Sequence, residues 1–120
     1  MILYLYILII LSLCGCAHIR PDHWDKVEIG QAVVLTALMA VDYGQSSMIV
    51  RNPDRYYEIN PILGDHPTQG AVNAYFPIAW AVKLAVAHFL PHPWRKAWLA
   101  FWAGESAVMV GRNYSIGLKP

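Results

Sequence analysis

Three carboxylate residues, Asp42, Glu58 and Glu105, are the side chains of this sequence best suited to chemistry. Asp42 and Glu105 stand within long apolar segments, where a charge costs about 2.5 to 3.5 kcal/mol on insertion scales and usually faces a partner or a wet cavity. Carboxylate oxygens bind hard cations, and together with a histidine such as His88 they can relay protons. The three residues therefore predict an ion- or proton-handling site, or an intramembrane enzyme.

A structural interpretation of these charges competes with the catalytic one. Lys83 lies midway along the second apolar segment and is the natural counter-charge for Asp42, while Arg112 stands two turns after Glu105. Such pairs would form an intramembrane polar network that fixes the register of the helices. As a third alternative, the charges lie near the interface and reach water along their aliphatic stems, which suits Arg112 best.

Other patterns for chemistry are weak. His88 and His92 have the i, i+4 spacing of metal ligands on a helix, but prolines flank His92 and interrupt any helix there. The two cysteines, Cys14 and Cys16, leave the following 104 residues without a thiolate. No Gly-rich phosphate loop, HExxH or GxSxG motif occurs. We expect no metal site and no cofactor, and the net charge of +1 disfavours nucleic acid as a partner.

The elements that must position these residues are three long apolar segments. Hydrophobic residues make up 57% of the chain and charged residues 14%, against the ~25% charged residues of an average soluble domain. The segments run from 29 to 50, from 71 to 90 and from 94 to 114, and each can form a helix that crosses a hydrocarbon core of ~30 Å. The predicted fold is all-α, a small transmembrane bundle of three helices, or four if an amino-terminal segment is retained.

That amino-terminal segment, MILYLYILIILSLCGC, is typical of an export signal. Its end, Leu13-Cys14-Gly15-Cys16, resembles the lipobox of bacterial lipoprotein precursors. The resemblance implies that residues 1–15 are a signal peptide that is removed, and that Cys16 becomes the lipidated first residue, carrying acyl chains such as palmitate. The alternative is an uncleaved amino-terminal anchor. Residues 16–28 are polar and are predicted to form an exposed linker to a helix that starts near Asp25, which leaves 29–120 as the membrane domain.

The segment from 51 to 70 is predicted to be an interfacial loop. Asn52-Pro53 and Asn60-Pro61 each place a capping side chain before a proline, which predicts a short helical turn at each site. Gly64 can end the second turn. A loop that simply lies on the membrane accounts for every residue here except Glu58.

The spacing Asp42-x3-Ser46 followed by Glu58-x-Asn60-Pro61 is similar to that of an uncharacterised family of small multi-pass membrane proteins of bacteria and their phages. The resemblance covers residues ~38 to 80. It implies a helical membrane fold and a loop motif of Glu58, Asn60 and Pro61, and it implies no known activity.

Helical periodicity assigns faces to the apolar segments. On the first segment, Asp42 shares a side with Gln31, Gln45 and Ser46, which predicts a polar stripe. Small residues share another side of each segment, and in lipid such residues allow close backbone approach, so we expect them to face one another in a packed bundle. These small residues are Gly30, Ala37, Ala40, Gly44 and Ser47 in the first segment, Ala74, Ala81 and Ala85 in the second, and Ala97, Ala100, Gly104, Ala107 and Gly111 in the third.

Together these patterns predict a small lipoprotein of the bacterial inner membrane with a structural or interaction role in the cell envelope, encoded by the bacterium or by a phage. It would be lipid-anchored at the periplasmic side and multi-pass. Its partners would be the lipid bilayer and other membrane proteins or further copies of itself. The alternatives are an enzyme or ion- or proton-handling protein that uses Asp42, Glu58 and Glu105, and an accessory protein of cell lysis.

Overall fold

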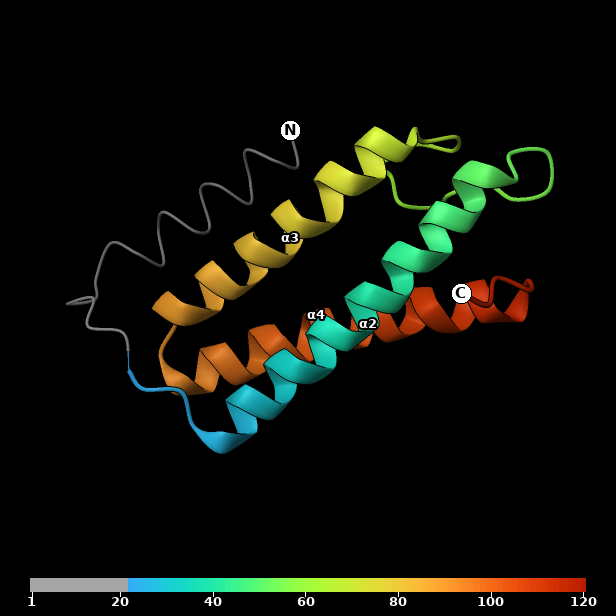
Figure 1. Cartoon of the computed structure of the whole chain (residues 1–120). Coiled ribbons are helices and arrows are strands. Elements are labelled where there is room, and N and C mark those ends of the chain that lie inside the picture. Colours follow the sequence, from blue (N-terminus) through green and yellow to red (C-terminus); the bar gives the residue numbers. More distant parts are fainter. Residues whose placement is uncertain (1–21) are drawn as a thin grey trace.

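The computed structural model describes residues 22 to 120, which form three helices (Figure 1). These are α2 (Lys26–Arg51), α3 (Gln69–Phe89) and α4 (His92–Ser115). Within this range there is no strand, so the predicted all-α class is confirmed. The predicted signal peptide, the lipidation site at Cys16 and the beginning of the linker lie outside the described residues.

The start of α2 is fixed by a capping box. The Asp25 side chain accepts a hydrogen bond from the backbone N–H of Glu28, and the Glu28 side chain accepts one from the backbone N–H of Asp25. This reciprocal pair satisfies two amide groups that the first turn of a helix otherwise leaves free. The helix start near Asp25 is confirmed. The linker prediction needs a correction, because Lys26 to Glu28 form the first turn of α2 and Glu28 is fully buried.

The connection between α2 and α3 contains the two predicted turns. The backbone N–H groups of Arg55 and Tyr56 donate to the carbonyl of Asn52, and those of Leu63 and Gly64 donate to the carbonyl of Asn60. Each Asn-Pro pair therefore starts one helical turn, as predicted. Gly64 ends the second turn with a φ of 76°, a left-handed conformation that glycine adopts without steric cost.

The boundary between α3 and α4 follows from two prolines. Thr68 caps the start of α3 by accepting a hydrogen bond from the N–H of Ala71. Pro91 lacks an N–H donor and separates the two helices, and Pro93 occupies the first turn of α4, where its missing donor does no harm. His88 and His92 therefore lie on different helices and lose the spacing of ligands on one helix.

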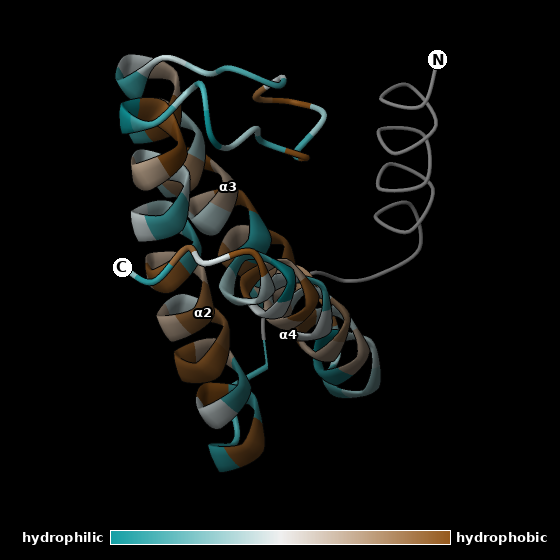
Figure 2. Ribbon diagram, turned by 90° about the vertical axis from the view of Figure 1, so that its right-hand side faces the viewer, coloured by the Kyte–Doolittle hydropathy of each residue, from teal (hydrophilic) through white to brown (hydrophobic). Residues whose placement is uncertain are grey.

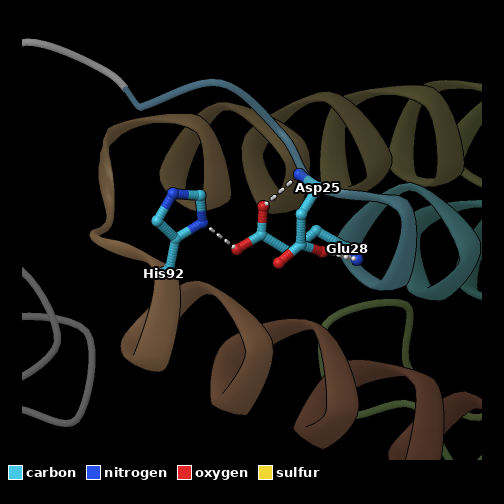
Figure 3. Close-up of side chains that lie close together, drawn as sticks. All are labelled: Asp25, Glu28 and His92. Carbon is cyan, nitrogen blue, oxygen red and sulfur yellow. Dashed lines mark hydrogen bonds and ion pairs between the residues drawn. The ribbon is translucent and has the colours of Figure 1, made fainter.

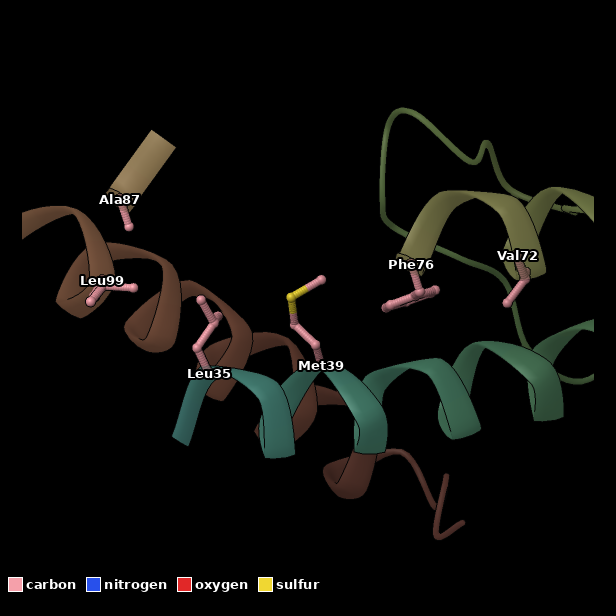
Figure 4. Close-up of a cluster of buried hydrophobic side chains, with 6 residues drawn as sticks. All are labelled: Leu35, Met39, Val72, Phe76, Ala87 and Leu99. Atoms are coloured by element: carbon pink, nitrogen blue, oxygen red, sulfur yellow. The ribbon is translucent and has the colours of Figure 1, made fainter. Parts of the chain in front are cut away.

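The three helices run up, down and up (Figure 1). α2 is antiparallel to α3 and crosses α4, with which it makes its most extensive contacts. Between the helices lies a small apolar core (Figure 4), in which Leu35 and Met39 of α2 approach α3 and α4. Its buried members are Leu35, Met39, Val72, Phe76, Ala87 and Leu99.

Two of the described helices, α2 and α3, are long and apolar enough to cross a membrane. α4 has sufficient length, with 24 residues, but it is not among them. It carries four charged residues, of which Arg95, Lys96 and Arg112 stand near its ends and Glu105 near its middle. Figure 2 shows hydrophobic residues along all three helices, whereas the connection from α2 to α3 is mainly hydrophilic.

The prediction that small residues face one another inside the bundle is wrong. A Cβ atom added to Gly30, Gly104 or Gly111 would meet nothing within 4 Å. Gly44 and Ser47 are exceptions, because a Cβ at Gly44 would come within 3.0 Å of Pro120 and Ser47 is buried. The predicted alanines of all three helices are exposed as well. The helices instead meet along faces that carry larger apolar side chains and a row of polar ones.

Candidate functional site

The bundle buries polar side chains in two groups. The Glu28 cluster lies where α2 begins and α3 gives way to α4, and it consists of Asp25, Glu28, His92, Arg95 and Lys96. The Asp42 cluster lies farther along α2 and consists of Asp42, Ser46, Glu58 and Lys83. About as many polar or charged side chains as hydrophobic ones are buried within residues 22 to 120. Buried polar groups are therefore a principal feature of this fold.

Glu28 is the centre of the first cluster (Figure 3). Its side chain is fully buried, and Oε2 accepts hydrogen bonds from Arg95 Nη1 at 3.0 Å and from the backbone N–H of Asp25 at 3.0 Å. Its other oxygen, Oε1, lies 2.7 Å from His92 Nδ1. Both carboxylate oxygens therefore have partners, which compensates for their removal from water.

Arg95 connects this carboxylate to the end of α3. Its Nε donates to the carbonyl of Ala87 at 2.7 Å and its Nη2 donates to the carbonyl of His88 at 3.1 Å. The last carbonyls of a helix have no partner within that helix, so the guanidinium satisfies them while its charge matches the negative end of the helix dipole. The fully buried Arg95 thus joins the start of α2, the end of α3 and the start of α4.

An exposed ion pair extends the Glu28 cluster to the surface. Lys96 Nζ lies 2.7 Å from Asp25 Oδ2. The Lys96 ammonium, hydrogen-bonded to this carboxylate, lowers the pKa of Asp25, and the capping hydrogen bond from the Glu28 N–H lowers it further. Both side chains are partly open to solvent, so the pair adds less to stability than the buried Glu28–Arg95 pair.

Asp25, Glu28 and His92 offer ligand atoms that lie within 4.8 Å of one another, which is the spacing of a metal site. The atoms, however, are engaged already: Asp25 Oδ1 accepts the capping hydrogen bond, Asp25 Oδ2 pairs with Lys96, and Glu28 pairs with Arg95. A cation would also have to approach the Arg95 guanidinium. The geometry therefore favours a structural ion-pair network over a metal centre.

In the Asp42 cluster, Glu58 links the loop to α2. Ser46 Oγ donates to Glu58 Oε2 at 2.7 Å, and Glu58 Oε1 accepts from the N–H groups of Ile59 and Asn60 at 3.0 and 3.1 Å. Only 1% of the Glu58 surface is exposed. The predicted loop motif thus acquires a physical role: Glu58 inserts between the loop and α2, and Asn60 caps the next turn by accepting from the N–H of Ile62.

Asp42 differs from every other buried carboxylate in the described residues. Only 8% of its surface is exposed, yet its Oδ1 has no hydrogen-bond partner within residues 22 to 120. The charges of Glu58, Glu105 and Lys83 act on it through space, and they come from the loop, from α4 and from α3. A buried acceptor without a partner is costly, so this oxygen marks a place where a proton, a water molecule or a cation would be stabilised.

Lys83 is buried and forms no ion pair with a carboxylate in the described part of the chain. Its Nζ lies instead 4.1 Å from the ring centroid of Trp102, a cation–π contact between α3 and α4. The direct pairing of Lys83 with Asp42 that the sequence suggested is therefore not formed in the described residues. The Lys83 ammonium packs on the Trp102 ring instead.

The second suggested pair, Glu105 with Arg112, is also not formed within residues 22 to 120. Glu105 is exposed on α4. Arg112 Nη1 donates to Asn113 Oδ1 at 3.2 Å, and its guanidinium lies 5.4 Å from the ring centroid of Tyr57. Of the four residues of the predicted network, only Asp42 and Lys83 are buried.

The predicted polar stripe on α2 is confirmed. Gln45 is fully buried and donates through Nε2 to the carbonyls of Val110 and Leu118, while its Oε1 accepts from Asn113 Nδ2 at 3.1 Å. Gln31 donates to the carbonyl of Lys96. Gln31 and Gln45 of the stripe therefore face α4, whereas Ser46 faces the loop. Three polar residues that make buried contacts were not identified from the sequence: Asn113, which bonds to Gln45, and the pair of Glu28 with Arg95. They are distant from their partners in the sequence, so only the folded chain shows that they meet.

The geometry gives the Glu28 cluster the character of a scaffold and the Asp42 cluster that of a candidate site. Comparison with models of protein families, with curated proteins and with solved structures finds no match for this chain.

Proposed function

We propose that this chain is a small integral membrane protein of the bacterial cell envelope, with three helices that cross the bilayer and a structural or interaction role. The observation that carries the proposal is the distribution of side chains in the bundle. Large apolar residues cover its outside, whereas charged and amide side chains fill much of its inside. This departs from the pattern in a protein folded in water, where buried side chains are mostly apolar.

The outward residues stand in the middle of the helices and not only at their ends. Val33, Ile78, Phe101 and Val108 are 62%, 63%, 63% and 71% exposed. They belong to all three helices, so each helix exposes large apolar side chains. Exposure of such side chains to water is unfavourable, whereas lipid tails are a favourable environment for them.

The inward residues support the same environment. Asp42, Gln45, Lys83 and Asn113 are all buried between helices. In a bilayer, polar side chains are stabilised by facing the interior of a bundle, where other protein groups replace water. α4 belongs to this arrangement despite its charges. On its interior face, Asn113 donates a hydrogen bond to Gln45 of α2, and the carbonyl of Val110 accepts one from Gln45.

The interaction role is supported by the outward small residues of α4. Ala97, Ala100, Gly104, Ala107 and Gly111 recur along one face of the helix, and all five are exposed. In lipid, a face of small residues allows another helix to approach closely. Such a helix would come from a partner membrane protein or from a second copy of this chain.

The lipoprotein part of the proposal rests on Leu13-Cys14-Gly15-Cys16. Acylation of Cys16 would hold the amino end of the mature chain at the periplasmic surface of the inner membrane. α2 begins at Lys26, so the lipid anchor and the first crossing would be joined by a short segment. This arrangement makes the protein both lipid-anchored and multi-pass.

Fractionation and mass spectrometry test the proposal together. After expression of the full chain in a Gram-negative host, alkaline carbonate should leave the protein in the membrane pellet, and neutral detergent should release it. The released protein should begin at Cys16 and carry added acyl mass. Recovery in the carbonate supernatant would refute the membrane assignment, and an intact Met1 without acyl mass would refute lipidation alone.

Handling of protons or cations is a second candidate function, favoured by the unpartnered Oδ1 of buried Asp42. In liposomes that hold a pH-sensitive dye, the reconstituted chain should then dissipate an imposed proton or Na⁺ gradient. Asp42→Asn should abolish the flux, whereas Glu105→Gln, at an exposed position, should retain most of it. Equal leakage from empty liposomes and from those with protein would exclude this function.

A further inference from the structure

A groove of about 650 Å³ lies between the carboxyl end of α2, the start of α3 and the residues that follow α4. We call it the Arg51 groove. It is separate from the Asp42 and Glu28 clusters, because none of their residues lines it. Pro120 closes one side by packing on Gly44.

Two cationic side chains line this groove, Arg51 from α2 and Lys119 from the segment after α4. Both are exposed, and neither forms an ion pair with any residue from 22 to 120. No Asp or Glu side chain is among the lining residues. The side chains that line the groove therefore carry net positive charge, which is complementary to an anionic group.

The polar floor of the groove is held in place by hydrogen bonds between α2 and α3. Gln69 Nε2 donates to Ser47 Oγ at 3.1 Å and to Asn73 Oδ1 at 2.9 Å, and Tyr43 Oη donates to the same Oδ1 at 2.8 Å. These contacts fix the Asn73 amide and leave its Nδ2 without an acceptor in the described residues. Asn73 lines the same groove as the two cations and thus offers a further donor there.

The groove also lies where a lipid headgroup would lie. α2 ends at Arg51 and α3 begins at Gln69, so in the proposed membrane bundle these residues stand at the level of the headgroups. Met48 and Pro120 add apolar lining next to the charged part. Basic pockets between transmembrane helices are suited to anionic headgroups, whose acyl chains continue along the helices.

We propose that the Arg51 groove binds the phosphate of an anionic phospholipid headgroup, with Arg51, Lys119 and the Nδ2 group of Asn73 as its donors. The inference rests on the proposed crossing of the membrane. It gives the protein a lipid partner of defined charge, in addition to the bilayer as a whole.

Native mass spectrometry of the full chain in neutral detergent tests this proposal. Phosphatidylglycerol and phosphatidylcholine with the same acyl chains serve as probes, and both contain a phosphate while only the first has a net negative charge. The wild-type chain should bind phosphatidylglycerol more tightly. Arg51→Gln and Lys119→Gln should each weaken that binding about fivefold, the effect expected for one basic residue near an anionic headgroup.

Two further variants distinguish specific binding in the Arg51 groove from general attraction between exposed cationic side chains and an anionic lipid. Lys26→Gln removes an exposed lysine at the opposite end of α2 and should leave the lipid preference unchanged. Asn73→Ala keeps the charge and should weaken phosphatidylglycerol binding severalfold. Circular dichroism confirms that each variant keeps its helices, which is expected because Arg51, Lys119 and Asn73 are exposed.

The outcomes are distinct. Equal binding of both lipids, or the same loss in Lys26→Gln as in Arg51→Gln, overturns the proposal while leaving the membrane assignment intact. Complete displacement of phosphatidylglycerol by inorganic phosphate shows that the groove takes a free anion, which also overturns it. A chain that stays dissolved without detergent refutes the membrane assignment and this lipid site together.

Discussion

The Glu28 cluster and the Asp42 cluster bury similar side chains between the same three helices, but they differ in how completely those side chains are paired. In the first, Glu28 Oε2 and Arg95 Nη1 lie 3.0 Å apart, and the other polar atoms of both side chains also have hydrogen-bond partners. In the second, Asp42 keeps an oxygen without a partner, and Lys83 rests on an aromatic ring. A cluster whose polar groups are all paired holds helices together. A cluster with an unpaired polar group can still bind a proton, a water molecule or a cation.

The largest effect is expected from breaking the buried pair of the Glu28 cluster. Glu28→Gln leaves the Arg95 guanidinium buried without a counter-charge and should lower the free energy of unfolding by about 3 to 5 kcal/mol. Unfolding in mixed micelles, followed by circular dichroism, measures this loss. A loss below about 1 kcal/mol would show that the pair is not the scaffold of the bundle.

Loss of the loop anchor should rank second. Glu58→Ala strands the Ser46 hydroxyl and two backbone N–H groups, which should destabilise the loop by about 1 to 3 kcal/mol. Trypsin should then cut faster after Arg55, which is exposed in the loop. Asp54→Asn changes an exposed carboxylate of the same loop and is the matched control. Equal cleavage rates in both variants would contradict the anchoring role.

A smaller change in stability is expected at Asp42, and this prediction sharpens the contrast most. Asp42→Asn conserves shape and replaces a carboxyl group whose Oδ1 has no hydrogen-bond partner, so the free energy of unfolding should change by less than about 1 kcal/mol in either direction. The same assay as for Glu28→Gln measures it. A loss as large as that of Glu28→Gln would mean that Asp42 belongs to a structural network after all.

The smallest effect concerns the exposed pair of Asp25 with Lys96 and depends on pH. Because Lys96 lowers the pKa of Asp25 below its ordinary value of 3.8, the ionised form stabilises the fold. That contribution is fully present above pH 3.8 and is lost as the pH falls through the lower pKa of the folded state.

Asp25→Asn retains an N-cap oxygen but cannot pair with Lys96. It should therefore be slightly less stable than wild type at about pH 6, and the difference should vanish by about pH 2. The measurement compares the free energy of unfolding of the wild-type chain with that of Asp25→Asn across this pH range. A difference that does not depend on pH would show that the cap, and not the charge, is responsible.

The sequence predicted well what local chemistry decides. Asp25 and the Asn-Pro pairs are capping and turn signals whose effect depends on neighbouring residues, so the start of α2 and of both turns could be placed. The polar stripe that contains Gln45 followed from helical periodicity alone. The part played by Glu58 needed the fold, because Ser46 reaches it only when the chain turns back on α2.

Contacts between distant residues could not be predicted. Glu28 and Arg95 are 67 positions apart, and no local signal connects them. Periodicity identified the small residues that share a face, but it does not say whether that face meets a neighbouring helix or the surroundings. The pairing of Lys83 was wrong for a similar reason, because Trp102 competes with a carboxylate for the ammonium and only its position in space decides between them.

The most direct test asks whether α4, the least apolar of the three helices, presents its apolar face to lipid. Spin labels at Phe101, Val108 and the buried Ser106 are introduced singly into a chain whose two cysteines are replaced by serine, and the chain is reconstituted in liposomes. Labels at Phe101 and Val108 should collide more with oxygen, which concentrates in lipid, than with a water-soluble nickel chelate, and the label at Ser106 should be protected from both. Stronger collision with nickel than with oxygen at Phe101 and Val108 would place this face in water and contradict the membrane bundle.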